Sequence, residues 1–165
     1  MTETFKPEEH RFCETHYFED LEVGRRFYIA SRTLGDANFA AFQLASGDNH
    51  PIHYDVEYCR ARGHRDLLAH GFQVLIQTAA GAGVFPHVIG DALVAFVSQS
   101  SQFLAPVYAG DTVYPALEIV ELTPQRSTGV VVVRSTVHNQ DGILVMDGEQ
   151  RYVVRRRDAA KPRKG

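Results

Sequence analysis

The chain has 165 residues, of which 44% are hydrophobic and 22% are charged, the balance of an ordinary globular protein. One domain of this size buries roughly two-thirds of the surface that its unfolded chain exposes, so its core needs no disulfides or metal ions. The net charge of −3 is unevenly spread: residues 1–150 hold 10 basic and 19 acidic side chains, whereas residues 151–165 hold seven basic and one acidic. The acidic body argues against a protein that binds duplex nucleic acid.

Cysteine usage and the N-terminal sequence indicate the cellular setting. Cys13 and Cys59 are the only cysteines, and neither lies in a CxxC pair, so no disulfide framework is expected. Residues 1–12 lack the basic and then apolar pattern of a secretion signal, and polar side chains interrupt the longest apolar stretch, residues 71–85. We therefore expect a cytoplasmic protein without a membrane span.

The first elements expected are a strand and a helix. Val23, Phe27 and Ile29 recur at spacings of four and two residues, which predicts an early strand after a turn at Gly24. Asp36 is the expected N-cap of a helix that Gly47 ends. The apolar side of this helix consists of Phe39, Phe42 and Leu44.

Two further helices are expected. A short one begins near Asp55 and ends at Gly63. Residues 70–85 have almost no polar face, which is typical of a helix enclosed on several sides, and Pro86 is expected to end it. Its small residues permit close approach of whatever covers it.

The sequence pattern of the second half of the chain predicts strands. Four segments rich in Val, Ile, Tyr and Phe are separated by short turn signals. Short links predict an antiparallel sheet, and a sheet this long covers the enclosed helix only by curling around it. The expected class is α+β, an antiparallel sheet around a long central helix. The four segments are DALVAFVSQSSQFLAPV, DTVYPALEIVEL, TGVVVVRSTVHN and GILVMDGEQRYVVRRR.

The densest polar segment is SGDNHPIHYD, residues 46–55. It places Asp48 and His53 five residues apart across a turn that Pro51 stiffens. A carboxylate and an imidazole in an apolar cleft can hold one water between them and move protons in both directions. We expect burial to raise the pKa of Asp48, since an aspartate with an ordinary pKa near 3.9 is a poor base at neutral pH.

Spacing alone leaves three interpretations of this segment open. In the first, Asp48 and Asp55 are turn and cap residues and the histidines are surface groups. The second is a metal site, and the third is acid/base catalysis by Asp48 and His53. No HExxH motif or paired CxxC supports a metal site. Its ligands would be Asp48, His50 and His53 with His64 or His70.

Four motifs in order carry a family resemblance. SGDNHPIHYD is followed by LLAHGF at residues 67–72 and FLAPVYAGDT at residues 103–112, and HYFEDLEVGRRF opens the match at residue 16. Together they resemble the MaoC-like dehydratases and (R)-specific enoyl-CoA hydratases. That family has the hotdog fold, an antiparallel β-sheet wrapped around a long central α-helix, which agrees with the periodicity. The resemblance covers about residues 16–154.

The resemblance implies a catalytic pair and a substrate class. Asp48 and His53 are the positions that would hold the water added to a trans-2-enoyl-CoA, or removed in the reverse dehydration. The N–H groups near Gly71, at the start of the enclosed helix, are the expected oxyanion site. The remaining expected substrate-binding positions are His70, Asn49 and His50. No metal and no cofactor is implied beyond the coenzyme A thioester. The structural alternative is that His70 caps the helix and Gly71 only packs.

The sequence departs from the family pattern at two positions. His50 stands where the signature usually has Asn, with Asn49 one place early. Cys59 stands where a small Ala or Ser is usual, and we expect it to pack as a small apolar side chain.

The expected domain organisation is an N-terminal extension over residues 1–15, one hotdog domain over residues 16–157 and a basic tail over residues 158–165. The basic end is either a loose solvated end or a clamp in which Arg155–Arg157 reach the phosphates of coenzyme A. A homodimer at least is expected, because an unpaired apolar edge strand favours association. A non-catalytic acyl-CoA or acyl-carrier binding protein and a hotdog thioesterase are the alternative functions.

Overall fold

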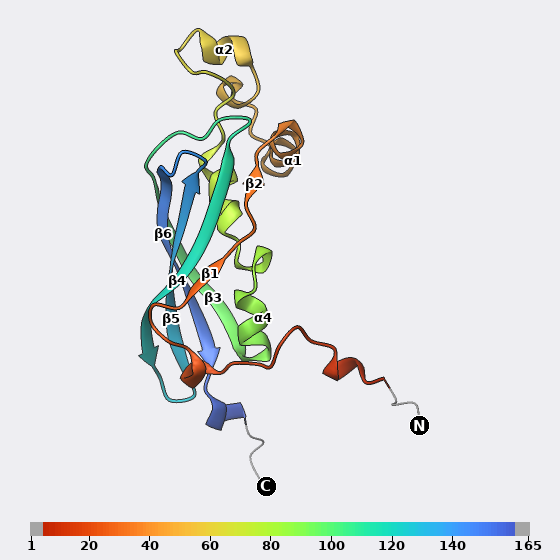
Figure 1. The fold of residues 1–165 in the computed structure, drawn as a ribbon, viewed down its shortest axis with the longest axis vertical. Helices are drawn as coiled ribbons and strands as arrows, with labels where there is room; N and C mark the ends of the chain where they lie inside the picture. Colours follow the sequence, from red (N-terminus) through yellow and green to blue (C-terminus); the bar gives the residue numbers. More distant parts are fainter. Residues whose placement is uncertain (1–4, 161–165) are drawn as a thin grey trace.

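The computed structural model describes residues 5–160 and shows one curled antiparallel sheet with helical segments along one face (Figure 1). Within these residues the sheet has six strands in the order β1-β4-β5-β6-β3, and β2 pairs with β4. The expected α+β class and the expected four long strands are therefore confirmed. The strands are β1 (Arg26–Tyr28), β2 (Arg32–Thr33), β3 (Leu93–Phe103), β4 (Thr112–Pro124), β5 (Thr128–Asn139) and β6 (Leu144–Arg155).

The inner face of the sheet follows from alternation of side chains along the long strands. Every second residue is buried over Val113–Ile119 of β4 and along β5, because neighbouring side chains of a strand point to opposite faces. Short turns join β4 to β5 and β5 to β6, and the turn after β5 has Gly142 at φ +74°. The buried inner-face residues include Val113, Leu117, Ile119, Val131, Val133, Val137, Met146 and Val154.

Helix α1 (Asp36–Ser46) ends as the sequence predicts but begins differently. Gly47 follows it at φ +70°, in the left-handed conformation that glycine adopts readily. The N-cap is Gly35 rather than Asp36, and the Asn38 side chain accepts a hydrogen bond from its N–H at 3.1 Å. Leu44 is exposed rather than buried, so the apolar face of α1 is narrower than expected.

The segment expected as one long central helix is broken into pieces. It consists of α3 (Gly71–Leu75), η4 (Ile76–Thr78), η5 (Ala80–Ala82) and α4 (Phe85–Ile89), followed by η6 (Gly90–Ala92). Ala79 leaves the helical conformation with ψ 116°, and Gly83 is extended. The expectation of a continuous helix over residues 70–85 was therefore wrong, although the pieces follow one another along the inner face of the sheet (Figure 1).

The break has a local cause in the approach of the chain to β1. Gly83 forms an isolated bridge with Ile29, and a Cβ at Gly83 would lie 3.0 Å from the Ile29 side chain. This contact needs extended backbone at Gly83, which a continuous helix cannot supply. Pro86 then lies in the first turn of α4 and begins that helix instead of ending the previous one.

One side of this segment is exposed rather than enclosed. Val74 and Phe85 pack into the core, but Phe72 is 61% exposed and Ile76 is 51% exposed. In the single chain the sheet therefore covers only the inward side of the segment. No helix within residues 5–160 is long and apolar enough to cross a membrane.

Two of the described basic C-terminal residues, Arg156 and Arg157, are held by the body of the protein. Arg156 Nε donates to Glu19 at 2.7 Å, and Arg157 pairs with Asp20 and lies over the Tyr17 ring. Both partners belong to η2 (Phe18–Asp20), so these two arginines are neither a loose end nor free to clamp a phosphate. Strand β6, which these residues follow, ends at the end of the sheet remote from α2 (Figure 1). Residues 161–165 of the expected tail lie outside the described residues.

This ion pair predicts a pH-dependent contribution to stability. The hydrogen bond from Arg156 lowers the pKa of Glu19 from 4.5 to about 2. A carboxyl group with a depressed pKa stabilises the folded state above its unfolded pKa, and this stability is lost as the pH falls from about 4.5 towards 2. Glu19→Gln is expected to lower the free energy of unfolding by about 1 kcal/mol at pH 7 and by much less near pH 2. Urea unfolding at the two pH values tests this, and an equal loss at both would contradict it.

Candidate active site

The loop after α1 presents Asp48 at one end of the sheet. Gly47 turns the chain out of α1, and the Asp48 N–H donates to Ser46 Oγ at 3.2 Å. One carboxylate oxygen of Asp48, Oδ1, accepts from the His50 N–H at 2.8 Å. The chain then enters η3 (Pro51–His53), in which Pro51 occupies the first turn. Asp48 is therefore held by its own loop, with Oδ2 left for other contacts.

The imidazole of His53 is oriented by a backbone carbonyl. Its Nδ1 lies 2.6 Å from the carbonyl oxygen of Leu68, and the Leu68 N–H donates to the Ile52 carbonyl at 3.1 Å. A carbonyl oxygen only accepts, so Nδ1 of His53 carries the proton. Nε2 of the neutral ring is then unprotonated and available as a base.

His70 adopts the opposite tautomer. As the N-cap of α3, its Nδ1 accepts from the Phe72 N–H at 3.0 Å. In the neutral ring the proton therefore lies on Nε2, which is 3.1 Å from Asp48 Oδ2. His70 therefore caps α3, as expected in the interpretation that gives His70 a capping role only. Its Nε2–H also donates a hydrogen bond to the carboxylate of Asp48.

Asp48, His53 and His70 form one cluster. Each contributes an atom that lies within 4.8 Å of the atoms of the other two, and all three side chains are partly buried. A water with hydrogen bonds of about 2.8 Å spans such a gap between a carboxylate and an imidazole. The tautomers disfavour the metal interpretation, because a metal ion at His70 Nε2 would need the proton on Nδ1, where the Phe72 N–H already donates.

The pKa of Asp48 is shifted in the direction opposite to that expected. The hydrogen bond from the His50 N–H, and the charges of His53 and His70 when protonated, hold it below its ordinary value against a weaker effect of burial. Asp48 is therefore an ionised carboxylate at neutral pH, suited to accept a hydrogen bond from water. Burial and the negative charge of Asp48 raise the pKa of the neighbouring Tyr54 phenol, which stays protonated.

An apolar groove begins at His53. It has a volume of about 400 Å³ and passes between α3 and the segment that follows β3. Gly71 is the first residue of α3, so its N–H has no partner within the helix, and no hydrogen bond from it is found within residues 5–160. A Cβ at Gly71 would lie 2.9 Å from the Phe103 ring, so glycine also serves packing there. The groove is lined by His53, Leu68, Ala69, Gly71, Val74, Phe103, Leu104, Ala105, Pro106, Val107 and Val145.

Two of the expected substrate-binding residues, Asn49 and His50, make contacts within the loop. Asn49 Oδ1 accepts from Gln43 of α1 at 2.7 Å, and its Nδ2 donates to the Gly47 carbonyl, so its amide holds the loop to α1. The exposed His50 ring packs edge-on against Tyr58 with 5.8 Å between ring centroids. The His50 ring also lies 6.2 Å, centroid to centroid, from the ring of His53. The contact of Asn49 and His50 with substrate stays a prediction.

Helix α2 (Val56–Arg60) closes the loop. Asp55 caps it by accepting from the Tyr58 N–H at 3.0 Å, and Gly63 follows at φ +81°, as the sequence predicts. Cys59 is fully buried, and its thiol donates to the Ile52 carbonyl at 3.0 Å. The packing role expected for Cys59 is confirmed.

An ion pair that sequence reasoning missed anchors the segment before α3. Asp111 is 2% exposed and accepts from the Tyr108 N–H at 2.8 Å, from Gln140 at 2.9 Å and from Arg65. Burial opposes ionisation of Asp111, but these donors outweigh it and lower its pKa. Arg65 lies three residues before Leu68, whose carbonyl orients His53. Asp111 is the last residue of the Ala-Gly-Asp segment at residues 109–111, which the sequence pattern predicts only as a turn.

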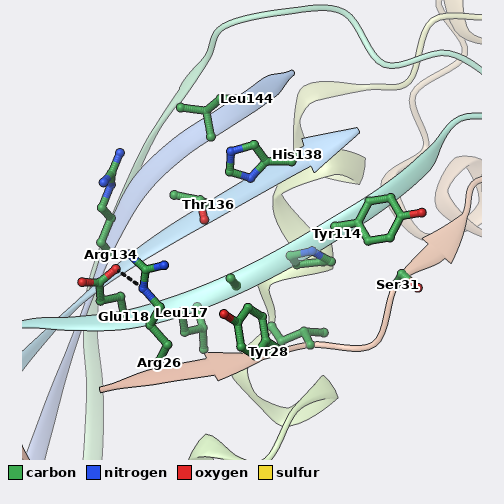
Figure 2. A pocket seen from close by; sticks show the side chains of 13 residues that line it. Arg26, Tyr28, Ser31, Tyr114, Leu117, Glu118, Arg134, Thr136, His138 and Leu144 are labelled. Atoms are coloured by element: carbon green, nitrogen blue, oxygen red, sulfur yellow. Dashed lines mark hydrogen bonds and ion pairs between the residues drawn. The ribbon is translucent and has the colours of Figure 1, made fainter. Parts of the chain in front are cut away.

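A larger pocket of about 540 Å³ lies on the outer face of the sheet, away from this cluster. Figure 2 shows Tyr28 and Tyr114 at one side of it and Arg26 paired with Glu118 at the other. Arg134 at its rim pairs with Asp147 at 2.6 Å. Its charges are neutralised within the sheet, so the smaller groove at His53 is the better candidate for chemistry.

The fold and the position of the cluster define a class of protein. A curled antiparallel sheet that packs on a helical segment is the hotdog fold. A conserved hypothetical protein from Mycobacterium tuberculosis, described as having a double hotdog fold, matches this chain with a TM-score of 0.74 and 27% identity. The match covers 90% of this chain and 46% of that one. The MaoC like domain family matches residues 20–141, and the chain belongs to this family.

Two relatives indicate the chemistry of the family. A 3-hydroxybutyryl-CoA dehydratase from Methylorubrum extorquens is 30% identical over 150 residues, which cover 88% of each chain. An (R)-specific enoyl-CoA hydratase from Rhodospirillum rubrum is 30% identical over 143 residues, covering 84% of this chain and 92% of its own. At the family level the activity is that of a lyase that hydrates or dehydrates acyl thioesters, and the family's enoyl-CoA hydratases act on coenzyme A thioesters without a cofactor.

Proposed function

We propose that this protein is a hydro-lyase that adds water to a trans-2-enoyl-CoA to form a 3-hydroxyacyl-CoA, or catalyses the reverse dehydration. The observation that carries the proposal is the cluster of Asp48, His53 and His70, with opposite histidine tautomers, at the mouth of an apolar groove. The cluster supplies one free base and one fixed carboxylate, as the addition of water requires.

Each group has a role in the proposed reaction. Asp48 accepts a hydrogen bond from the water and orients it, and His70 holds the Asp48 carboxylate through Nε2. His53 Nε2 removes a proton from the water as its oxygen bonds to the β-carbon. The Gly71 N–H donates to the thioester oxygen, where the enolate charge develops.

The protonated His53 then completes the addition. It returns its proton to the α-carbon, which restores the thioester carbonyl and leaves the histidine neutral. The sum adds one hydroxyl and one hydrogen across the double bond, and the reverse sequence is dehydration. The Leu68 carbonyl at Nδ1 stabilises the charged ring between the two proton transfers.

The assay that tests this function follows the absorbance of the conjugated enoyl thioester. Crotonyl-CoA and longer or branched enoyl-CoAs are the substrates, and the absorbance is expected to fall as water is added. An unchanged absorbance across the panel would favour a non-catalytic acyl-CoA or acyl-carrier binding protein. Release of free thiol would show a hotdog thioesterase instead.

We also propose a cytoplasmic location. Both cysteines, exposed Cys13 and buried Cys59, are free, which is consistent with this location.

The proposed functional unit is a homodimer. Strand β3 ends the strand order, so its outer edge is unpaired within the described chain. Phe96 and Val97 of β3 are 56% and 60% exposed, and Phe103 at the end of β3 lies beside Gly71, the first residue of α3. A second copy that pairs edge to edge along β3 would cover these apolar side chains and the groove beside Phe103.

Val97→Lys is expected to convert the dimer into a monomer. A charge on an edge strand opposes pairing, because the lysine would have to be desolvated in the interface. Light scattering during gel filtration measures the mass of wild type and variant. Val120→Lys, on the exposed face of β4, is the matched control and should leave the mass unchanged. A dimeric Val97→Lys protein would contradict pairing along β3.

A further inference from the structure

Three arginines lie in and just after α2, the helix that closes the catalytic loop at one end of the molecule (Figure 1). Two of them have carboxylate partners: Arg65 pairs with the buried Asp111, and Arg60 pairs with Glu57 on the same helix. Arg62 is exposed and makes no ion pair with any residue of the described chain. It is therefore a positive charge without a counter-charge beside the candidate active site.

Arg62 is held in place although it has no ion pair. The central carbon of its guanidinium lies 3.4 Å from the centre of the Tyr58 ring, and its Nη1 donates to the Tyr58 carbonyl at 3.2 Å. An aromatic face attracts a guanidinium without neutralising it. Four of the five N–H donors of the group stay available, in the planar arrangement that suits a carboxylate or a phosphate.

A row of aromatic side chains connects Arg62 with His53. The Tyr58 ring lies edge-on to the His50 ring with 5.8 Å between centroids, and the His50 and His53 rings are 6.2 Å apart. These steps place the guanidinium within about 16 Å of His53. His50 is exposed, and Tyr58 and His53 are half-buried. A ligand can therefore follow the row along the surface without entering the core.

The row matches the length of the arm that carries an acyl group in coenzyme A. About 13 covalent bonds separate the thioester sulfur from the first phosphorus, and an extended chain gains about 1.2 Å per bond, so the arm spans up to about 16 Å. The apolar groove that begins at His53 is lined by no residue of α2 and not by Arg62. The acyl chain in the groove and the arm over the aromatic row therefore use separate surfaces.

We propose, on the basis of the proposed function, that Arg62, assisted by Arg60, binds the phosphate groups of a coenzyme A thioester. The pantetheine arm lies over His50 and Tyr58, and the Arg62 guanidinium donates paired hydrogen bonds to phosphate oxygens. Arg60 is two residues away, and its pair with Glu57 is exposed on both sides. Exposed ion pairs are weak, so Arg60 can turn from Glu57 to a phosphate.

Other arginines of the described chain suit this role less well. Arg156 and Arg157 follow β6 at the end of the sheet remote from α2, where acidic residues of η2 pair with them. Arg26 and Arg134 are paired on the outer face of the sheet. Arg65 is committed to Asp111. Arg62 combines a free charge with a short surface path to His53.

Arg62 also has a possible role that involves no ligand. A basic side chain after a helix stabilises its C-terminal end, and Arg62 donates to a carbonyl of α2. A role confined to the helix predicts that a substitution acts equally on all thioester substrates. Phosphate binding predicts an effect that depends on the phosphates of the substrate.

The test compares crotonyl-CoA with crotonyl-pantetheine, which has the same acyl group and arm but no phosphate. The ratio of their kcat/KM values is expected to fall about 5–20-fold in Arg62→Gln, between the values for an exposed ion pair and a charge-assisted hydrogen bond. The loss should lie in KM for crotonyl-CoA, because the contact is equal in the ground and transition states. Arg62→Lys should keep most of the ratio, since it keeps the charge.

Arg157→Gln is the matched control. Arg157 also lies over a tyrosine ring, at 4.9 Å from the centre of Tyr17, but it follows β6 at the remote end of the sheet. Its substitution should keep the wild-type ratio. Salt gives a second readout: the wild-type ratio should fall as ionic strength rises, and the Arg62→Gln ratio should fall less.

A third thioester, crotonyl-4′-phosphopantetheine, identifies the phosphate. A loss with this compound in Arg62→Gln assigns the contact to the phosphate that a carrier protein thioester shares. A loss with crotonyl-CoA alone assigns it to the phosphates found only in coenzyme A.

The outcomes separate this inference from the proposed function. An unchanged ratio in Arg62→Gln would overturn the inference alone, and so would an equal loss of kcat/KM for crotonyl-CoA and crotonyl-pantetheine. Hydration of none of the three thioesters by the wild type would overturn the proposed function as well. Each ratio is measured within one protein, so a change in the folded fraction does not alter it.

Discussion

His53→Ala is expected to lower kcat for hydration of crotonyl-CoA by about 10²–10⁴-fold, the range that a positioned general base contributes. The Leu68 carbonyl holds Nδ1 as a donor, so Nε2 is the free base of the cluster. Asp48→Asn should reduce kcat similarly, because the amide keeps the shape of the carboxylate but presents a donor in place of one acceptor oxygen. The kcat of each variant is measured at saturating crotonyl-CoA, by stopped assays or by following the absorbance.

A matched control separates catalysis from a general effect of charge. Asp147→Asn also removes an aspartate that is hydrogen-bonded to a neighbouring group, here Arg134 on the outer face of the sheet. Its kcat is expected to stay within twofold of wild type, about 0.4 kcal/mol. Full activity in both Asp48→Asn and His53→Ala would remove these residues from the site and leave the fold unaffected.

Asp111→Asn is expected to lower the free energy of unfolding by about 2–3 kcal/mol, since three donors converge on a buried carboxylate. The same substitution should lower kcat by about 10²-fold, with a smaller change in KM, because the segment that carries Leu68 and His70 loses its anchor. The lowered pKa of Asp111 gives the pH dependence its sign: the stability is present above the unfolded pKa and is lost as the pH falls below about 4.

Denaturant unfolding and the kcat assay test this prediction together. Asp147→Asn is again the control, because its carboxylate is more exposed and its loss should cost less than about 1 kcal/mol. If Asp111→Asn is destabilised but keeps full kcat at a temperature where it is folded, Asp111 stabilises the turn without positioning His53. If neither quantity changes, the proposed anchor is wrong.

Local patterns predicted most of the elements of the fold. Alternation of apolar residues located β3 to β6, and glycines at positions 47 and 63 ended α1 and the turn after α2 as expected. The long helix was wrong because helical periodicity says nothing about a distant strand. The bridge of Gly83 to Ile29 breaks it, and these residues are 54 positions apart in sequence.

The candidate site was also predicted only in part. The motif predicted Asp48, His53 and His70 as site residues, and the structure places them in one cluster. His53 and Gly71 line the apolar groove. The substrate contacts expected of Asn49 and His50 stay predictions, because the structure shows only that both side chains make contacts within the loop. The proton on each histidine depends on a backbone group, which no side-chain pattern records.

By itself, the sequence determined the α+β class, the succession of the strands along the chain and the candidate site residues, because these depend on periodicity and on motifs within short segments. Only the tertiary structure decided the tautomers of His53 and His70, the ionised state of Asp48 and the anchoring of Arg156 to η2. The contacts of His53 and Arg156 join groups that are distant in sequence. Those of His70 and Asp48 use backbone N–H groups two residues away, whose directions are set only by the folded backbone, and these hydrogen bonds and nearby charges set which protonation state is stable.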